Sequence, residues 1–301
     1  MRNYIYILLL FTLLCFYLIN SSLVITSIIN YTELFITKLF PASFIFFIIS
    51  YLLLDYNLVF YINRLFRVNG AVFYVLILSL ISGFPSGSKY IVDLYKRGII
   101  TDKLSNYLLM FTHFPNPIFI LGSVSILFNN KLYPIYILIV LIISNFIIGF
   151  LFRPKTIEKI NYECNNTTFS NSLSKAVISS FKIILLIYGT SIFFYLIITI
   201  ISKYISFSNY SFIFVNGIFD LINGIFLTSL INNDFIKALF IIFFISFGGI
   251  SVNMQVKSII SDTSVSYKYF IIGRMLQFII SIVLLSTIVY WSNYINWIFI
   301  S

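Results

Sequence analysis

The chain has 301 residues, of which 60% are hydrophobic and only 9% are charged, whereas a typical soluble domain carries about 25% charged residues. This composition excludes a soluble module and predicts one integral membrane domain in contact with the lipid bilayer. The net charge is +10, but the basic residues lie in short connectors without the interleaved aromatic side chains of a nucleic-acid surface. We therefore expect no nucleic-acid partner.

The N-terminal region, 1–69, contains two apolar segments and one amphipathic segment. Segments 4–29 and 34–54 are each long enough to cross a bilayer core of about 30 Å. The first segment lacks an A-x-A-like cleavage site and is longer than a signal-peptide core, so we expect an uncleaved anchor. Segment 57–68 alternates apolar and basic residues at helical spacing, which predicts an interfacial helix.

The rest of the chain mixes complete and interrupted apolar segments. Full-length spans are expected at 132–152, 178–201 and 267–290. Other apolar segments are too short or too broken to cross comfortably, namely 71–83, 104–114, 118–128, 211–222 and 235–247. Basic residues in short loops place Arg64 and the polar loop on the cytoplasmic side, with the N-terminus inside and the C-terminal tail outside.

These segments divide into two blocks of similar design. A first repeat at 70–152 is followed by a cytoplasmic loop at 153–177, and 178–301 holds a connecting span and a second repeat. One intervening span inverts the second repeat relative to the first, which is the arrangement of inverted-repeat transporters. The predicted fold class is an all-α polytopic membrane protein with inverted repeats, broken helices and re-entrant hairpins.

Polar interruptions fall at corresponding places in the two repeats. The first repeat contains SGFPSG and then FTHFPNPIF, and the second contains FDLINGIF and then SFGGISVNMQ. Paired interruptions of this kind are the best sequence indication of a binding site near the bilayer midplane. We expect two helical hairpins of opposite orientation, near 86–113 and 233–262, that meet at mid-depth.

The first interruption has the residues of an anion-binding turn. Pro85 stops a helix, while Gly83 and Gly87 allow tight backbone turns. The hydroxyl groups of Ser86 and Ser88 and the free amides of a helix N-terminus would then point at a ligand. The alternative is a surface turn with no ligand.

The second interruption holds His113, which is the one histidine of the chain, and Asn116 between two prolines. An amide side chain can serve donors and acceptors at an unwound break, so Asn116 is a candidate ligand group. His113 is either a contact for substrate or proton, or a structural hydrogen-bonding residue.

The second repeat places Asp220 inside an apolar half-span. An acidic side chain at membrane depth is costly and indicates a functional site. Asp220 could hold a proton or Na⁺, or pair with a cation such as Lys89. Nearby polar or flexible positions are further candidates for substrate contact: Asn223, Gly224, Gly248, Gly249, Ser251, Asn253 and Gln255. Ser251 and Gln255 share one helix face.

Motifs of enzymes and metal sites are missing from the sequence. It has no Walker loop, no nucleophile elbow and no paired metal ligands, and its two cysteines, Cys15 and Cys164, indicate neither a disulfide framework nor a metal knuckle. We therefore expect no catalytic activity, no metal and no cofactor.

Four segments together resemble a known family. SGFPSGSKYIVDLYKRGIIT, FPNPIFILGSV, FDLINGI and ISFGGISVNMQVKSIISDT are similar to signature segments of the YlbJ-type sporulation integral membrane proteins, also called SpoVV, which contain the Gate (nucleoside-recognition) domain. The resemblance covers about residues 70–290. It implies an architecture similar to concentrative nucleoside transporters and a role in moving dipicolinic acid across the outer forespore membrane of a spore-forming bacterium.

An aromatic dianion would suit broken-helix N-termini, hydroxyl groups and one or two fixed cations. Lys89 and Arg274 are the candidate cations, and Arg274 could instead pair with Asp220. Two alternatives stay open, namely a transporter of nucleosides or other small anions and a non-transporting assembly protein whose Gly and Ser residues serve helix packing. The coupling ion, the direction of transport and the oligomeric state, a homo-oligomer included, also stay open.

Overall fold

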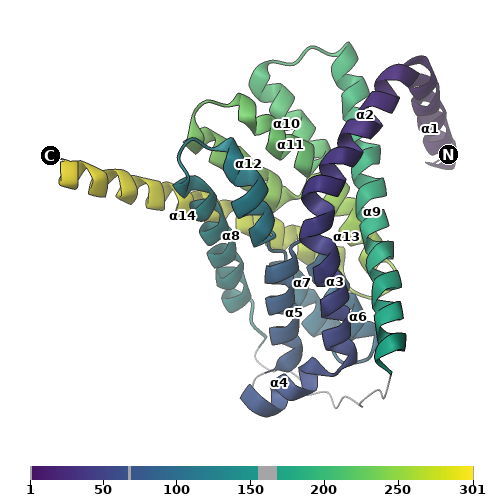
Figure 1. Cartoon of the computed structure of the whole chain (residues 1–301), viewed down its shortest axis with the longest axis vertical. Coiled ribbons are helices and arrows are strands. Elements are labelled where there is room, and N and C mark those ends of the chain that lie inside the picture. The colour runs from purple at the N-terminus through teal and green to yellow at the C-terminus, as the bar shows by residue number, and fades with distance from the viewer. Residues whose placement is uncertain (1, 67–68, 155–167, 301) are drawn as a thin grey trace.

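The structure, a computed structural model, describes residues 2–66, 69–154 and 168–300. Over these residues the regular elements are all helices, as the composition predicted (Figure 1). Four helical stretches are long and apolar enough to cross a bilayer, and up to six if each bent helix pair is counted as one span. Most of the loop predicted at 153–177 lies outside the described residues, as does Arg67 of the predicted interfacial helix.

The N-terminal part differs from the two predicted spans. Helix α1 (Arg2–Ile19) meets α2 (Ser21–Leu34) at an angle of 93°. Helix α2 then runs on through a π-helical turn, η1 (Phe35–Leu39), into α3 (Phe40–Asp55). The boundary expected between 4–29 and 34–54 is therefore wrong, because the corner lies at Asn20 and the chain is helical from there to Asp55.

Hydrogen bonds hold this corner to the far end of the long helix α9 (Phe169–Tyr204). Lys203 Nζ donates to Asn20 Oδ1 at 2.5 Å, and Asn20 Nδ2 donates to the Tyr204 hydroxyl at 3.1 Å. Helices α2 and α3 pack along α9. Beyond the corner, α1 exposes apolar side chains around its whole circumference, which is suited to lipid.

Helix α4 (Leu58–Phe66) forms the predicted amphipathic helix and bends by 66° away from α3. The bend follows Asn57, whose φ is 60°. Asparagine tolerates this left-handed conformation better than most residues.

The first repeat begins with a tight helical hairpin. Helices α5 (Gly70–Ser82) and α6 (Ser86–Lys96) fold back on each other around residues 83–85. The rings of Tyr74 and Tyr90 lie 5.9 Å apart, and the hydroxyl groups of Ser82 and Tyr90 lie 2.8 Å apart, so the two helices pack against each other across the turn.

An interrupted helix and a long helix complete this repeat. Helix α7 (Asp102–Phe111) ends at an extended break and is followed by η2 (Phe119–Val124) and η3 (Ser125–Leu127). The long helix is α8 (Leu132–Leu151), which confirms the span expected at 132–152.

The second repeat has the same order of elements. Helices α10 (Asn209–Phe219) and α11 (Leu221–Leu227) fold back at Asp220, and η4 (Thr228–Leu230) ends this hairpin. Asn223 Nδ2 donates to Asn216 Oδ1 at 2.8 Å across it. Helices α12 (Asp234–Phe247) and α13 (Gly249–Ile260) form one interrupted span, and α14 (Tyr267–Ile300) is the long helix.

The two hairpins enter from opposite ends of the molecule, as the inverted-repeat prediction requires (Figure 1). Of the two predicted ranges, 86–113 holds a pair of packed helices, α6 and α7. The range 233–262 is one interrupted span and not a hairpin, and the two hairpins that enter from opposite ends are 70–96 and 209–230. The expectation that segment 235–247 is too short to span is wrong, because α13 continues the direction of α12 past Gly248 and the two helices together form a span of 27 residues.

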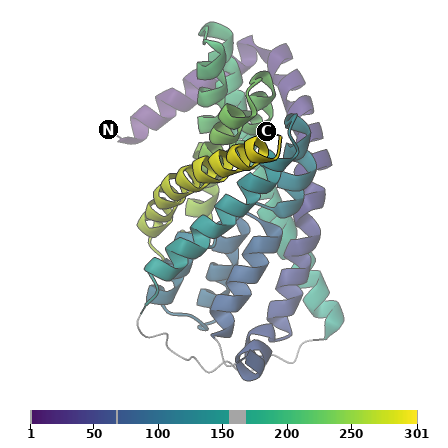
Figure 2. The same ribbon diagram turned by 90° about the vertical axis from the view of Figure 1, so that its left-hand side faces the viewer.

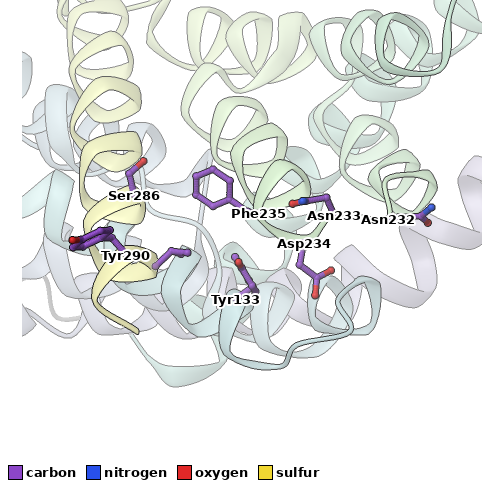
Figure 3. A pocket seen from close by; sticks show the side chains of 8 residues that line it. Tyr133, Asn232, Asn233, Asp234, Phe235, Ser286 and Tyr290 are labelled. Carbon is purple, nitrogen blue, oxygen red and sulfur yellow. The ribbon is translucent and has the colours of Figure 1, made fainter. Parts of the chain in front are cut away.

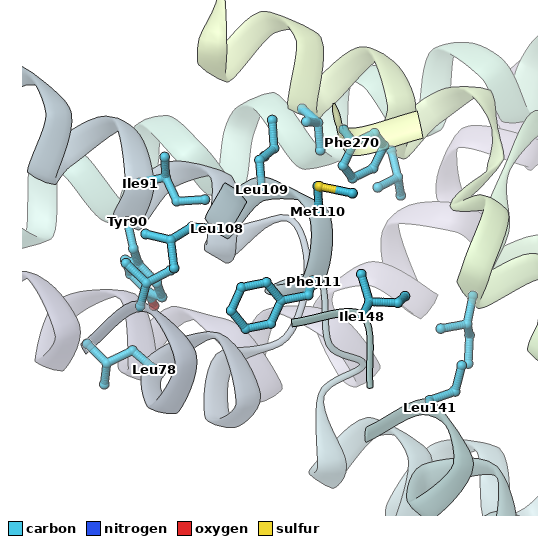
Figure 4. Packing of buried hydrophobic residues seen from close by; sticks show 14 of the residues in the cluster. Leu78, Tyr90, Ile91, Leu108, Leu109, Met110, Phe111, Leu141, Ile148 and Phe270 are labelled. Atoms are coloured by element: carbon cyan, nitrogen blue, oxygen red, sulfur yellow. The ribbon is translucent and has the colours of Figure 1, made fainter. Parts of the chain in front are cut away.

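The two repeats contact each other through their long helices, α8 and α14. Figure 2 shows α8 and α14 side by side, and Ser281 Oγ donates to Ser144 Oγ between them at 2.9 Å. The core around Met110, Phe111, Ile148 and Phe270 joins α7, α8 and α14 (Figure 4). At Gly273 a Cβ atom would collide with the Met110 carbonyl group, so the absence of a side chain lets α14 lie directly against α7.

Candidate functional site

A small cavity lies where the two hairpin tips approach each other. Its lining comes from the turn of the first hairpin, the break after α7, the start of α11 and the α2–α3 column, in the residues Leu39, Ser43, Ser82, Phe84, Asn116, Phe119, Leu221 and Ile222. Its volume is about 30 Å³, enough for about one water molecule, whereas small-molecule sites have volumes of about 300–1,000 Å³. The space between the hairpin tips is therefore too small for a small-molecule ligand.

The residues of the first break mainly shape the turn itself. Ser88 Oγ donates to the Pro85 carbonyl oxygen at 2.6 Å, and Ser86 Oγ donates to the Gly83 carbonyl oxygen. The two hydroxyl groups therefore point into the turn and not at a ligand. Ser82, which the sequence analysis did not select, is the hydroxyl residue that lines the cavity.

The glycines of this break allow close approach to the other break. Gly83 has a φ of 75°, and a Cβ atom there would lie 2.7 Å from the Asn116 backbone nitrogen. A Cβ atom on Gly87 would collide with the Thr112 carbonyl oxygen. Both glycines thus allow the turn of the first hairpin to pack against the non-helical backbone at 112–116.

Asn116 connects the two breaks and lines the cavity. Its Nδ2 atom donates to the Ser82 carbonyl oxygen at 3.3 Å, and its Oδ1 atom accepts from the Ile118 amide at 2.8 Å. The side chain therefore serves both a donor and an acceptor, as expected for an amide at an unwound segment.

His113 lies behind the cavity wall. Its ring stacks on Phe84 with centroids 5.1 Å apart and meets Phe270 edge-on at 4.9 Å. It is buried and is not among the residues that line the cavity. The ring therefore packs between Phe84 and α14, and its Nε2 atom has no hydrogen-bond partner among the described residues, so the structural hydrogen bond considered above is not formed by this atom.

Arg274 reaches from α14 into the break of the first repeat. Its guanidinium group donates to the carbonyl oxygens of His113 and Met110, both at 3.1 Å, and to Asn145 Oδ1 at 3.3 Å and Gln277 Oε1. These acceptors include carbonyl groups that the end of α7 leaves without helical donors. Arg274 thus stabilises the break, and among the described residues it forms no ion pair with Asp220.

Lys89 also has a different partner from the one considered in the sequence. Its Nζ atom lies 2.7 Å from Asp93 Oδ2, one helical turn along α6, and 5.9 Å from the centre of the Tyr51 ring. Arg97 and Asp55 form a second ion pair nearby, at 3.4 Å, in contact with the same Tyr51 ring. These charges join α6 to α3.

Asp220 occupies the tip of the second hairpin and is completely buried. It accepts from the Tyr31 hydroxyl at 3.1 Å, from Ser251 Oγ at 3.1 Å and from the Asn223 amide at 3.0 Å. The last contact makes it the N-cap of α11. The sequence named Ser251 as a candidate substrate contact and did not name Tyr31, because no local pattern relates α2 to a hairpin 189 residues away.

Gln255 does not contact Asp220 directly but bonds to its neighbour Ser191. Its Nε2 atom donates to Ser191 Oγ on α9 at 3.2 Å, and the Ser191 side chain is a neighbour of Asp220. Ser251 therefore contacts Asp220 directly, and Gln255 reaches it only through Ser191; the substrate contacts predicted for Ser251 and Gln255 stay predictions.

The remaining predicted residues of the second repeat allow close helix packing or bind main-chain atoms at the break. A Cβ atom on Gly224 would collide with the Gly217 Cα atom, so these glycines set the spacing of α10 and α11. Gly248 and Gly249 have φ values of 81° and 61°. Asn253 Nδ2 donates to the Phe247 and Gly249 carbonyl oxygens at 2.8 and 2.6 Å, which satisfies the backbone at this break.

A larger hollow, of about 590 Å³, lies at the surface where the turns after η3 and η4 meet (Figure 3). It is lined by Tyr133, Asn232, Asn233, Asp234, Phe235, Ser286, Val289 and Tyr290. Asp234 there pairs with Lys237 at 3.2 Å and accepts from the Asn130 amide at 2.8 Å. None of the four breaks contributes a lining residue, so this groove is separate from the candidate site.

Comparison with known proteins identifies one informative relative. The chain is 26% identical over 289 residues to the sporulation integral membrane protein YlbJ of Bacillus subtilis (strain 168), with 79% of this chain and 71% of YlbJ covered. This similarity confirms the resemblance to YlbJ-type sporulation membrane proteins. No protein-family model and no solved structure matches the chain, so the assignment of a Gate domain stays a prediction.

Proposed function

Starting from the similarity to YlbJ-type sporulation integral membrane proteins, we propose that the chain is a secondary transporter that acts in sporulation. Its substrate is a small aromatic dicarboxylate, and the family resemblance points to dipicolinate and to the outer forespore membrane. The observation that carries this proposal is the cavity bordered by the tips of two oppositely directed hairpins. Movement of either hairpin would open the same point to a different side, which is the requirement for alternating access.

The chemistry of the cavity suits a planar ring with polar edges. Phe84, Phe119 and Ile222 offer apolar surface, while Ser82 and Asn116 offer polar groups. The N-terminus of α6 adds the positive end of a helix dipole near the first hairpin tip. Because the cavity has room for only about one water molecule, substrate entry requires the hairpins to separate.

Purified protein in liposomes tests this function directly. Uptake of labelled dipicolinate should be saturable and should be reduced by unlabelled dipicolinate more than by nucleosides. Ser43→Phe should abolish it, because Ser43 lines the cavity and a ring would fill the small volume. Ser22→Phe is the matched control, since Ser22 is exposed on α2.

The expected result is uptake in the wild type and in Ser22→Phe but not in Ser43→Phe, at equal amounts of inserted protein. Absence of uptake and of dipicolinate binding in correctly inserted wild-type protein would overturn the transport proposal. It would favour the assembly role, in which the glycine contacts serve helix packing alone.

A further inference from the structure

Asp220 is a buried carboxylate surrounded by neutral groups. Its exposed fraction is 0%, and its hydrogen-bond donors are two hydroxyl groups and one backbone amide at 3.0–3.1 Å. None of the ion pairs among the described residues includes it. An ionised carboxylate removed from water is costly without a cation.

Within the described part of the chain, the elements that bond to Asp220 offer it polar groups, and no basic side chain pairs with it. Helix α2 contributes Tyr31, and α9 contributes Ser191 and Tyr195, whose ring lies 4.7 Å from that of Tyr31. Helix α13 contributes Ser251, and α11 contributes the Asn223 amide. The titratable neighbours are therefore two tyrosines, which are neutral at physiological pH.

A second observation concerns Gln255, which is 1% exposed and whose Oε1 atom has no hydrogen-bond partner in the described part of the chain. Its Nε2 atom donates to Ser191 Oγ at 3.2 Å and to the Ile187 carbonyl oxygen at 3.4 Å. The buried polar cluster around Asp220 and Ser191 thus contains an acceptor that none of the described groups satisfies.

A proton on Asp220 removes the cost of a buried charge. The protonated carboxyl group is neutral, and its O–H donates to the Tyr31 or Ser251 hydroxyl oxygen, each 3.1 Å away, while that hydroxyl group turns its own hydrogen aside. The step needs no added volume, whereas a metal cation would have to displace oxygens that already lie at hydrogen-bond distance from one another.

We propose that Asp220 binds one proton reversibly and that this proton couples the transport cycle to a pH gradient. The proton comes from water on one side, forms an O–H bond with a carboxylate oxygen, and leaves to water on the other side, so the substrate is chemically unchanged. This inference rests on the proposed transport function. Asp220 is suited to coupling because it caps α11, whose first residues, Leu221 and Ile222, line the cavity.

Infrared spectroscopy of the purified full chain tests proton binding without a substrate. The protonated carboxyl band should appear and disappear as pH is varied in the wild type and in Asp262→Asn, whose side chain is exposed, and it should be lost in Asp220→Asn. Tyr31→Phe keeps the carboxylate and removes one donor, so its band should titrate at a different pH.

Two results would overturn proton binding. The first is an identical carboxyl band in Asp220→Asn. The second is a band that responds to Na⁺ at constant pH in the wild type but not in Asp220→Asn, which would identify a sodium site instead. If Asp220→Asn fails to insert, an unchanged titration in Tyr31→Phe contradicts the proposal on its own.

Transport assays separate coupling from substrate binding. In Asp220→Asn, uptake driven by a pH gradient should fall about tenfold or more, in the range of usual coupling between two sites, while exchange of labelled for unlabelled dipicolinate persists. Loss of exchange in inserted Asp220→Asn protein would make Asp220 a substrate contact and overturn the coupling role. Absence of exchange in the wild type would instead reject the transport function. Proton binding by Asp220 would then still be tested by the infrared titration, which needs no substrate.

Discussion

At the scale of single residues, the four breaks show where backbone groups without helical partners find hydrogen bonds. Asn116, Asn253 and Arg274 all bind main-chain atoms that an uninterrupted helix would satisfy internally. Such backbone is tolerated at membrane depth only where protein or a cavity satisfies it. Several polar residues that the sequence suggested as ligands therefore stabilise the breaks, and Asp220 differs from them because its partners are mainly hydroxyl groups.

Arg274 provides a prediction at this scale. Arg274→Gln should lower the thermal stability of the purified protein, because each buried carbonyl group left without a donor costs about 1–3 kcal/mol. Arg153→Gln is the control, since Arg153 is exposed after α8. Because Arg274 and Asp220 form no ion pair, adding Asp220→Asn should not restore the loss. Recovery in the double variant, measured by thermal unfolding, would contradict the arrangement described above.

At the scale of elements, each repeat consists of a hairpin, an interrupted span and a long helix. The hairpins depend on small residues at their contacts, since lipid provides little hydrophobic drive for helices to associate. In the second hairpin, Gly217 and Gly224 face each other, and the ring of Phe244 on α12 covers Gly217. Close approach of backbones therefore replaces side-chain interdigitation at this tip.

Gly224→Ala should disturb the second hairpin, because its methyl group would overlap the Gly217 Cα atom. Overpacking of this kind costs about 1–3 kcal/mol, and we expect a lower unfolding temperature and slower dipicolinate uptake. Gly189→Ala on α9 is the matched control, since a Cβ atom there meets nothing within 4 Å. Equal behaviour of the two variants would show that the hairpin does not need this contact.

At the scale of the whole molecule, the site is shared between repeats. Phe84 and Asn116 of the first repeat line the same cavity as Leu221 and Ile222 of the second. Arg274 from the last helix supports a break in the first repeat, and Tyr31 from α2 binds the tip of the second hairpin. Movement of one hairpin would therefore change contacts that belong to the other repeat.

A cross-linking experiment tests this shared site. In protein with Cys15 and Cys164 replaced by serine, the pair Phe84→Cys and Ile222→Cys should react with a short bifunctional thiol reagent, because both residues line one cavity. Dipicolinate should slow the reaction. The pair Phe84→Cys and Leu230→Cys should stay unlinked, since Leu230 is exposed at the end of η4. Equal cross-linking of both pairs would contradict a meeting of the tips.

The sequence by itself determined the membrane class, the long spans near 132–152, 178–201 and 267–290, and the four breaks. These features depend on hydrophobic length and on residues such as Pro85 and Gly248, whose effects on the backbone are local. The sequence also identified Asp220, because a carboxyl group in an apolar segment is conspicuous in any fold.

Only the tertiary structure decided which breaks are hairpin tips and which are interruptions of a span. A glycine can reverse a chain or let a helix continue after one left-handed residue, and packing against distant helices selects between these outcomes. The same reason explains the partners of Lys89, Arg274 and Asp220. Local spacing fixes Lys89 beside Asp93 on one helix turn, but contacts such as Tyr31 with Asp220 join residues 189 positions apart, and the fold alone brings them together.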